Sequence, residues 1–242
     1  MVNVCRNQTN FDFFLFRIYG SSFLSLKRLV IFKIIKLNFI MRAIFISALL
    51  LISANLFSQS GRQRSFDSTL MQLKAQSKID KNDSSVFSLL ENFYDEVLQS
   101  DAGELSEKTR QKLIDLDQND DTRNKYLLTL FIIYQNHISQ TAAQEKSTDM
   151  QFQLACINSL EHEMMTLYNK VPVIVYLYKV EALHTAGHFD ESKKLADKSL
   201  KKFPHSIPLK VYKFLFSRDE TVKRDLVDNH SGHWMVQQFG IK

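Results

Sequence analysis

Apolar residues recur at helical spacing along most of the chain beyond residue 66. Between residues 82 and 100 one stripe has the spacing i, i+4, i+7 and i+11, and it consists of Val86, Leu90, Phe93 and Val97. A second stripe runs along residues 148–169, and it consists of Phe152, Cys156, Leu160, Met164 and Leu167. Such a stripe is the face that an amphipathic helix buries. We therefore predict a helix over each range.

Residues 126–134 are apolar on nearly every side, which predicts a central buried helix. This run is too short, and too closely flanked by polar residues, to span a membrane. Weaker patterns predict further helices over 67–78, 103–116, 207–216 and 219–228, and a loose connection over 141–149. The 242 residues include three prolines and six glycines, and no linker rich in Gly, Ser or Pro divides the body. We expect one all-α domain over 67–242.

The segment 173–206 has the pattern of two helices joined by a tight turn. Gly187 lies at the turn, where a left-handed backbone would disfavour a Cβ. Ser192 and Ala196 are small residues at the expected helix crossing, and Pro204 stops the second helix. The segment is 34 residues long, which is the period of the tetratricopeptide repeat.

In this segment the chain resembles the tetratricopeptide repeat (TPR) family. Tyr176 stands at the family's large aromatic position, whereas Lys179 and Val180 replace the usual Leu-Gly pair. The resemblance covers about a seventh of the chain, and the alternative is a generic helical hairpin. It implies helical hairpins stacked as a short TPR-like α-solenoid, in which residues 207–228 form a degenerate terminal repeat that caps the stack.

The resemblance also implies where a partner binds, because the first helices of stacked repeats line a concave face. Carried onto this repeat, that face holds Ile174 and four residues that we predict to be partner-binding: Tyr178, Glu181, His184 and Thr185. The steps between positions 174, 178, 181 and 185 place these residues on one side of a helix. The alternative is that the upstream helix 148–170 packs over this face.

The segment 41–58 has the composition of a signal peptide. Arg42 precedes an uncharged apolar run over residues 43–57, and Ser58 is small enough to precede a cleavage point. The segment resembles the secretion signals of Bacteroidetes proteins. We expect cleavage between Ser58 and Gln59, a polar N-terminal tail over 59–66, and a periplasmic or secreted mature protein.

Residues 1–40 are then an upstream extension, with Met41 as the true start. The alternative is a long uncleaved anchor from about residue 29 to residue 57. Lys33, Lys36 and Arg42 interrupt that span, and each would cost ~2.5–3.5 kcal/mol near the bilayer centre. We therefore expect no membrane span in the mature chain.

The net charge of +5 comes from the leader. Residues 1–58 hold seven Lys/Arg and one Asp, which leaves 24 basic and 25 acidic residues in the body. This balance gives no overall electrostatic case for nucleic-acid binding.

Candidate chemistry in the body is sparse. Cys156 is expected to be a buried apolar residue, and His162 with Glu163 to be surface residues, because Thr166 stands where a zinc-protease helix needs its second histidine. His230 and His233 alone do not make a metal site. Trp234 is expected to dock as an apolar cap, with an exposed partner anchor as the alternative.

These observations predict a scaffold that binds a protein or a peptide, with no enzymatic activity and no cofactor. The alternative function is a helical enzyme or small-ligand carrier whose pocket the sequence does not reveal. Paired acid and base residues, nucleophile motifs and phosphate-binding loops are not recognisable in the sequence, and this favours the scaffold.

Overall fold

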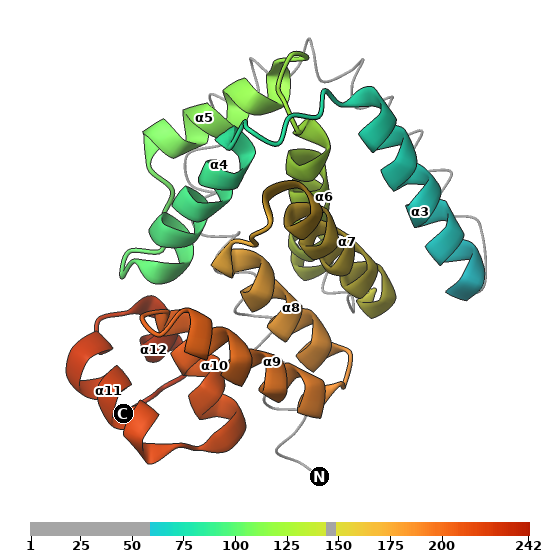
Figure 1. Cartoon of the computed structure of the whole chain (residues 1–242). Coiled ribbons are helices and arrows are strands. Elements are labelled where there is room, and N and C mark those ends of the chain that lie inside the picture. Colours follow the sequence, from blue (N-terminus) through green and yellow to red (C-terminus); the bar gives the residue numbers. More distant parts are fainter. Residues whose placement is uncertain (1–58, 144–148) are drawn as a thin grey trace.

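The computed structural model describes residues 59–143 and 149–242, and these residues form a stack of helices (Figure 1). The elements are α3 (Gln59–Gln76), α4 (Ser85–Phe93), the π-helix η1 (Tyr94–Gln99), α5 (Glu107–Gln118), α6 (Lys125–Ala143), α7 (Met150–Tyr168), α8 (Val173–Thr185), α9 (Phe189–Lys202), α10 (Ile207–Ser217), α11 (Glu220–His230) and α12 (Trp234–Gln238). Within the described ranges there is no strand, and from α6 onward each helix packs against the next. The all-α fold of stacked helical hairpins is therefore confirmed.

The structure describes only part of the segments predicted at the N-terminal end and at the 141–149 connection. The proposed extension 1–40, the signal segment 41–58 and most of the connection 141–149 lie outside the described residues. Residues 59–66, predicted as a polar N-terminal tail of the mature protein, form the first part of α3, which begins at Gln59. Phe66 is buried in an edge-to-face contact with Phe152 of α7, with 5.9 Å between the ring centres, and this contact holds α3 against the body. No helix in the described part of the chain is long and apolar enough to cross a membrane.

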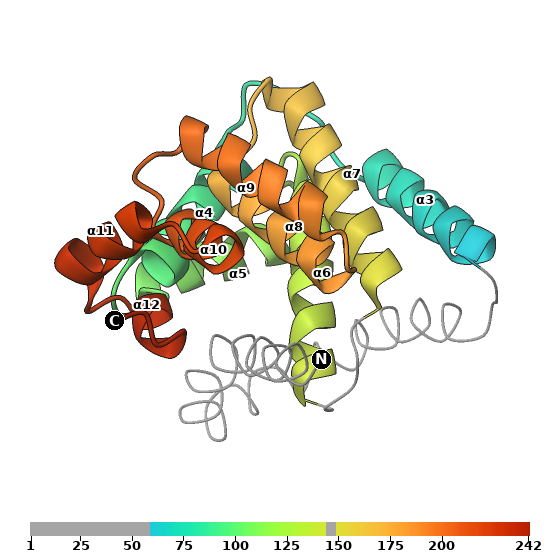
Figure 2. The ribbon, with the colours of Figure 1, turned by 90° about the horizontal axis from the view of Figure 1, so that it is seen from below.

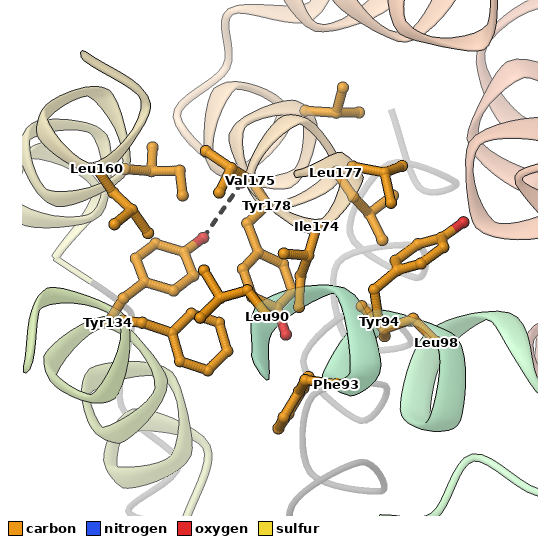
Figure 3. Packing of buried hydrophobic residues seen from close by; sticks show 14 of the residues in the cluster. Leu90, Phe93, Tyr94, Leu98, Tyr134, Leu160, Ile174, Val175, Leu177 and Tyr178 are labelled. Carbon is orange, nitrogen blue, oxygen red and sulfur yellow. Dashed lines mark hydrogen bonds between the residues drawn. The ribbon is translucent and has the colours of Figure 1, made fainter. Parts of the chain in front are cut away.

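Helix α8 occupies the centre of the stack. Figure 2 shows α8 between α7 and α9, and Figure 3 shows its side chains packed over those of α4, η1 and α6. Ile174, Leu177 and Val180 are each completely buried. Neighbours therefore cover α8 on several sides, which explains why apolar residues occupy nearly its whole circumference.

The turn between α8 and α9 has the geometry that the sequence predicts. Gly187 has a φ of +80°, and its N–H donates to the carbonyl of His184 at 3.0 Å. The N–H of His188 donates to the carbonyl of Leu183 at 2.9 Å. These two bonds form a Schellman motif, which satisfies the last carbonyls of a helix. Ser192 is fully buried at the crossing, and its hydroxyl donates to the carbonyl of Val180 at 2.8 Å.

The C-terminal end of the chain returns to η1. The indole N–H of Trp234 donates to the carbonyl of Val97 at 3.1 Å, and Nε2 of the buried His233 lies 3.0 Å from the carbonyl of Leu98. Gly103 lies against the indole, and a Cβ at this position would come within 3.0 Å of Trp234 Cδ1. Trp234 therefore docks as the predicted apolar cap.

A buried acid fastens α3 to α6 and α7. Glu163 is 7% exposed, its carboxylate accepts from the ammonium of Lys74 at 2.7 Å, and the hydroxyl of Tyr126 donates to it at 3.1 Å. The prediction that Glu163 lies on the surface was wrong, because α3 covers this side of α7. His162 is exposed, as predicted.

Candidate functional site

The face of α8 predicted to bind a partner lies mostly inside the protein. Ile174, Tyr178 and Glu181 are 0%, 1% and 4% exposed. The ring of Tyr134 from α6 stacks on Tyr178 with 5.2 Å between centres, and its hydroxyl donates to the Tyr178 carbonyl at 3.2 Å (Figure 3). The placement of Tyr178 and Glu181 on an open concave face was therefore wrong, because Tyr134 of α6 covers Tyr178 and Tyr212 of α10 covers Glu181.

Glu181 is buried against a tyrosine of the next hairpin. The hydroxyl of Tyr212 in α10 donates to Glu181 Oε1 at 2.7 Å. Burial raises the pKa of Glu181 to about 7, and the hydrogen bond from Tyr212 opposes this rise. The desolvated carboxyl of Glu181 lies in the core at the junction of two hairpins, where a partner cannot reach it.

The other two predicted site residues are half-buried at the end of α8. The ring of His184 lies 5.0 Å from the rings of both Phe189 and Phe216, and burial lowers its pKa. Thr185 follows at the last position of the helix. Tyr178 and Glu181 are buried, whereas His184 and Thr185 are partly exposed to solvent. The four predicted residues therefore do not form one surface.

The remaining candidates from the sequence have structural roles. Cys156 is fully buried, and burial raises the pKa of its thiol to about 12, which keeps the thiol protonated. His233 is buried, and its Nδ1 accepts from the N–H of Met235 as the cap of α12. The described residues contain no group of three or more His, Cys, Asp or Glu side chains that could hold a metal ion.

A surface groove lies between α4–η1 on one side and the segments around Pro172 and Pro204 on the other. Its volume is about 790 Å³, and it is open to solvent. Aromatic, aliphatic and proline side chains form much of its lining: Phe87, Tyr94, Val171, Pro172, Val173, Phe203 and Pro204. Charged residues stand on both sides, with Glu91 and Asp95 on α4–η1, and Lys170 and Lys202 opposite. The lining thus combines apolar surface with charges of both signs.

A π-helical segment contributes three of the lining residues. Tyr94, Asp95 and Gln99 belong to η1, and π-helical turns are rare and frequent at functional sites. The hydroxyl of Tyr94 lies 2.6 Å from Ser206 Oγ and 2.8 Å from Gln99 Oε1. The Gln99 amide also donates to the His205 carbonyl at 2.9 Å. This network fixes the two sides of the groove relative to each other.

The lysines of the groove are engaged with aromatic rings. The ammonium of Lys170 lies 4.0 Å from the ring centre of Phe87, and that of Lys202 lies 5.2 Å from the ring centre of Phe203. These distances are typical of cation–π contacts. The basic side of the groove therefore already has intramolecular partners.

The acidic side chains of the groove, unlike its lysines, have no such contacts in the described part of the chain. Glu91 and Asp95 are exposed and four residues apart, and neither carboxylate makes a hydrogen bond or ion pair within the described residues. Partial burial, followed by the neighbouring charge of Glu96, raises the pKa of Asp95. Glu96 itself accepts from the Ser106 N–H at 2.7 Å and from the Thr109 hydroxyl at 2.7 Å. Glu96 thus has a structural role, whereas Glu91 and Asp95 have none.

Sequence reasoning missed this groove because its sides come from residues about 110 positions apart, such as Tyr94 and Ser206. One signal was present in the sequence: two acids at i and i+4, a spacing that a helix does not favour. No family model, curated protein or solved structure matches the chain. The groove therefore has to be interpreted from its own chemistry.

Proposed function

We propose that this protein is a helical scaffold that binds an extended segment of a partner protein in the groove between α4–η1 and the Pro172 and Pro204 segments. The observation that carries the proposal is an open groove whose lining combines apolar side chains with charged side chains on both sides. Binding is the proposed activity, and no catalytic role is assigned to any residue.

The groove suits a peptide for physical reasons. Its volume of about 790 Å³ is within the range of ligand sites, about 300–1,000 Å³. Side chains of an extended segment alternate between two faces. Apolar side chains of the segment can therefore rest on Phe203 and Pro204 while its polar side chains reach the charged rims. Phe203 is half-buried and Pro204 is exposed, so apolar surface is available to a partner.

We also propose that the protein acts outside the cytoplasm. The support is the signal-like segment 41–58, with its apolar run and small residue before Gln59. The TPR relationship remains a proposal supported by the motif residues of 173–206 and by the turn at Gly187. In this proposal the partner contacts the groove rather than the covered face of α8.

A pair of matched histidine variants tests the proposal. Random peptides displayed on phage are selected on the purified protein, and the enriched peptides are synthesised and titrated by calorimetry. His205→Trp places an indole at the groove, whereas His162→Trp places one on the exposed side of α7. We expect His205→Trp to abolish peptide binding and His162→Trp to leave it unchanged. Equal binding by both variants, or no enrichment of any peptide, would refute the groove as the site.

A further inference from the structure

We propose that the partner segment presents a lysine or arginine side chain to Glu91 and Asp95, so that the groove selects cationic segments. This inference rests on the proposed binding function, and it names the chemistry of the ligand. It follows from three observations on the acidic side of the groove.

The first observation is that these two acids lower the stability of their own helix. Glu91 and Asp95 are at i and i+4, where like charges cost a helix about 0.2–0.5 kcal/mol. Asp95 also lies near the C-terminal end of the continuous α4–η1 helix, where the negative end of the helix dipole disfavours a carboxylate. Neither cost is offset by an ion pair within the described residues. Charges that oppose the local fold are expected where a ligand supplies the compensation.

The second observation is the contrast between the two sides of the groove. Lys170 and Lys202 each lie over an aromatic ring, so their charges already have favourable contacts. The carboxylates of Glu91 and Asp95 remain exposed and have no hydrogen-bond partner among the described residues, and Asp95 is already partly desolvated. An arriving cation therefore gains two carboxylates, whereas an arriving anion must compete with contacts that the lysines already make. The difference favours a basic ligand.

The third observation is the charge of the surrounding segment. Residues 80–121 contain twelve acidic and four basic residues, a net charge of −8, although the body as a whole is close to neutral. This segment forms α4, η1 and α5, so the negative potential surrounds the acidic side of the groove. A concentrated field of one sign raises the association rate of ligands of the opposite sign. Glu91 and Asp95 are the charged residues of this segment that line the groove.

Three synthetic heptapeptides test the inference. They are blocked at both ends, share two phenylalanines, and differ at two positions, which hold lysine, serine or glutamate. Each is titrated by calorimetry, with EDTA present so that metal ions play no part. The wild-type protein is expected to bind the lysine peptide roughly tenfold more tightly than the serine peptide, because each close charge pair contributes a modest amount. The glutamate peptide is expected to bind most weakly.

Matched neutral variants identify the residues responsible. Glu91→Gln combined with Asp95→Asn is expected to reduce the affinity for the lysine peptide to that for the serine peptide. The control combines Glu104→Gln with Asp117→Asn, which removes the same charge from the same acidic segment but outside the groove. The control is expected to keep most of the lysine preference. Circular dichroism verifies that each variant is folded. The single variant Glu91→Gln removes only one of the two charges and is titrated in the same way.

The outcomes separate the two proposals. If the double variant keeps the lysine preference, or if the control loses it equally, the contact with Glu91 and Asp95 is refuted. If the wild-type protein binds all three peptides equally, the selection for cations is refuted while the peptide-binding function stands. If it binds none of them, the peptide-binding function fails, and the inference fails with it.

Discussion

Replacing Glu181 by glutamine removes a carboxyl that is fully buried between α8 and α10. Glutamine has nearly the same shape, and its carbonyl oxygen can still accept the hydrogen bond that Tyr212 donates to Glu181 Oε1 at 2.7 Å. The substitution therefore changes the ionisation of the site more than its packing. We expect it to stabilise the protein at neutral and alkaline pH.

The magnitude follows from the pKa. Burial raises the pKa of Glu181 from an ordinary value of 4.5 to about 7. Below pH 4.5 the carboxyl is protonated in both the folded and the unfolded chain. Between pH 4.5 and 7 the unfolded chain releases this proton and the folded chain keeps it, so the free energy of unfolding falls as the pH rises. Each tenfold difference in proton affinity corresponds to about 1.4 kcal/mol, which makes the total loss about 3 kcal/mol above pH 7.

The assay is urea unfolding followed by circular dichroism, for wild type and variant, at intervals from pH 4.5 to 8. Glu181→Gln is expected to match the wild type near pH 4.5 and to exceed its free energy of unfolding by about 3 kcal/mol near pH 8. The exposed variant Glu104→Gln serves as a control and is expected to follow the wild type throughout.

A difference between Glu181→Gln and wild type that stays constant over this pH range would contradict the reasoning. So would a variant that is less stable than the wild type at pH 8. The first result would mean that Glu181 ionises in the fold as readily as in the unfolded chain. The second would mean that its charge contributes to the native structure.

Three further predictions concern the turn, the docked indole and the thiol. Gly187→Val is expected to destabilise the fold by about 1–2 kcal/mol in urea titration, because φ is +80°. Since no atom lies within 4 Å of the added Cβ, the cost is confined to the backbone, and an unchanged unfolding midpoint would contradict it. Gly103→Ala is expected to displace Trp234 and to shift its fluorescence, because the new Cβ would lie 3.0 Å from the indole; an unaltered spectrum would show that the loop yields instead. Cys156 is expected to resist thiol reagents until the protein unfolds, and rapid labelling of the native protein would contradict its burial.

Local patterns in the sequence predicted the helices and the α8–α9 turn well, because capping, turn and stripe signals are set by neighbouring residues. The stripe Val86, Leu90, Phe93 and Val97 is buried as expected. What the stripe does not encode is the widening of this helix into the π-helical η1, since the same residues would also bury one face of a regular α-helix.

The candidate site was predicted less well for a physical reason. Spacing correctly placed Tyr178 and Glu181 on one side of a helix, but spacing does not state what covers that side. Two distant aromatics, Tyr134 and Tyr212, cover it in the fold. The groove is likewise formed by packing between segments far apart in the chain, so no short window of sequence contains it.

The return of Trp234 and His233 to η1 has a consequence for how the protein unfolds. In an open array of repeats each unit touches its neighbours only, so end units can fray or be deleted while the rest stays folded. Here hydrogen bonds span 135 and 137 positions and join the last helix to the carbonyls of Leu98 and Val97. Loss of α12 would leave these two carbonyls without their partners and expose apolar surface near the start of the stack. These bonds therefore couple the unfolding of the last helix to that of η1, and removing a whole hairpin from the stack would break them.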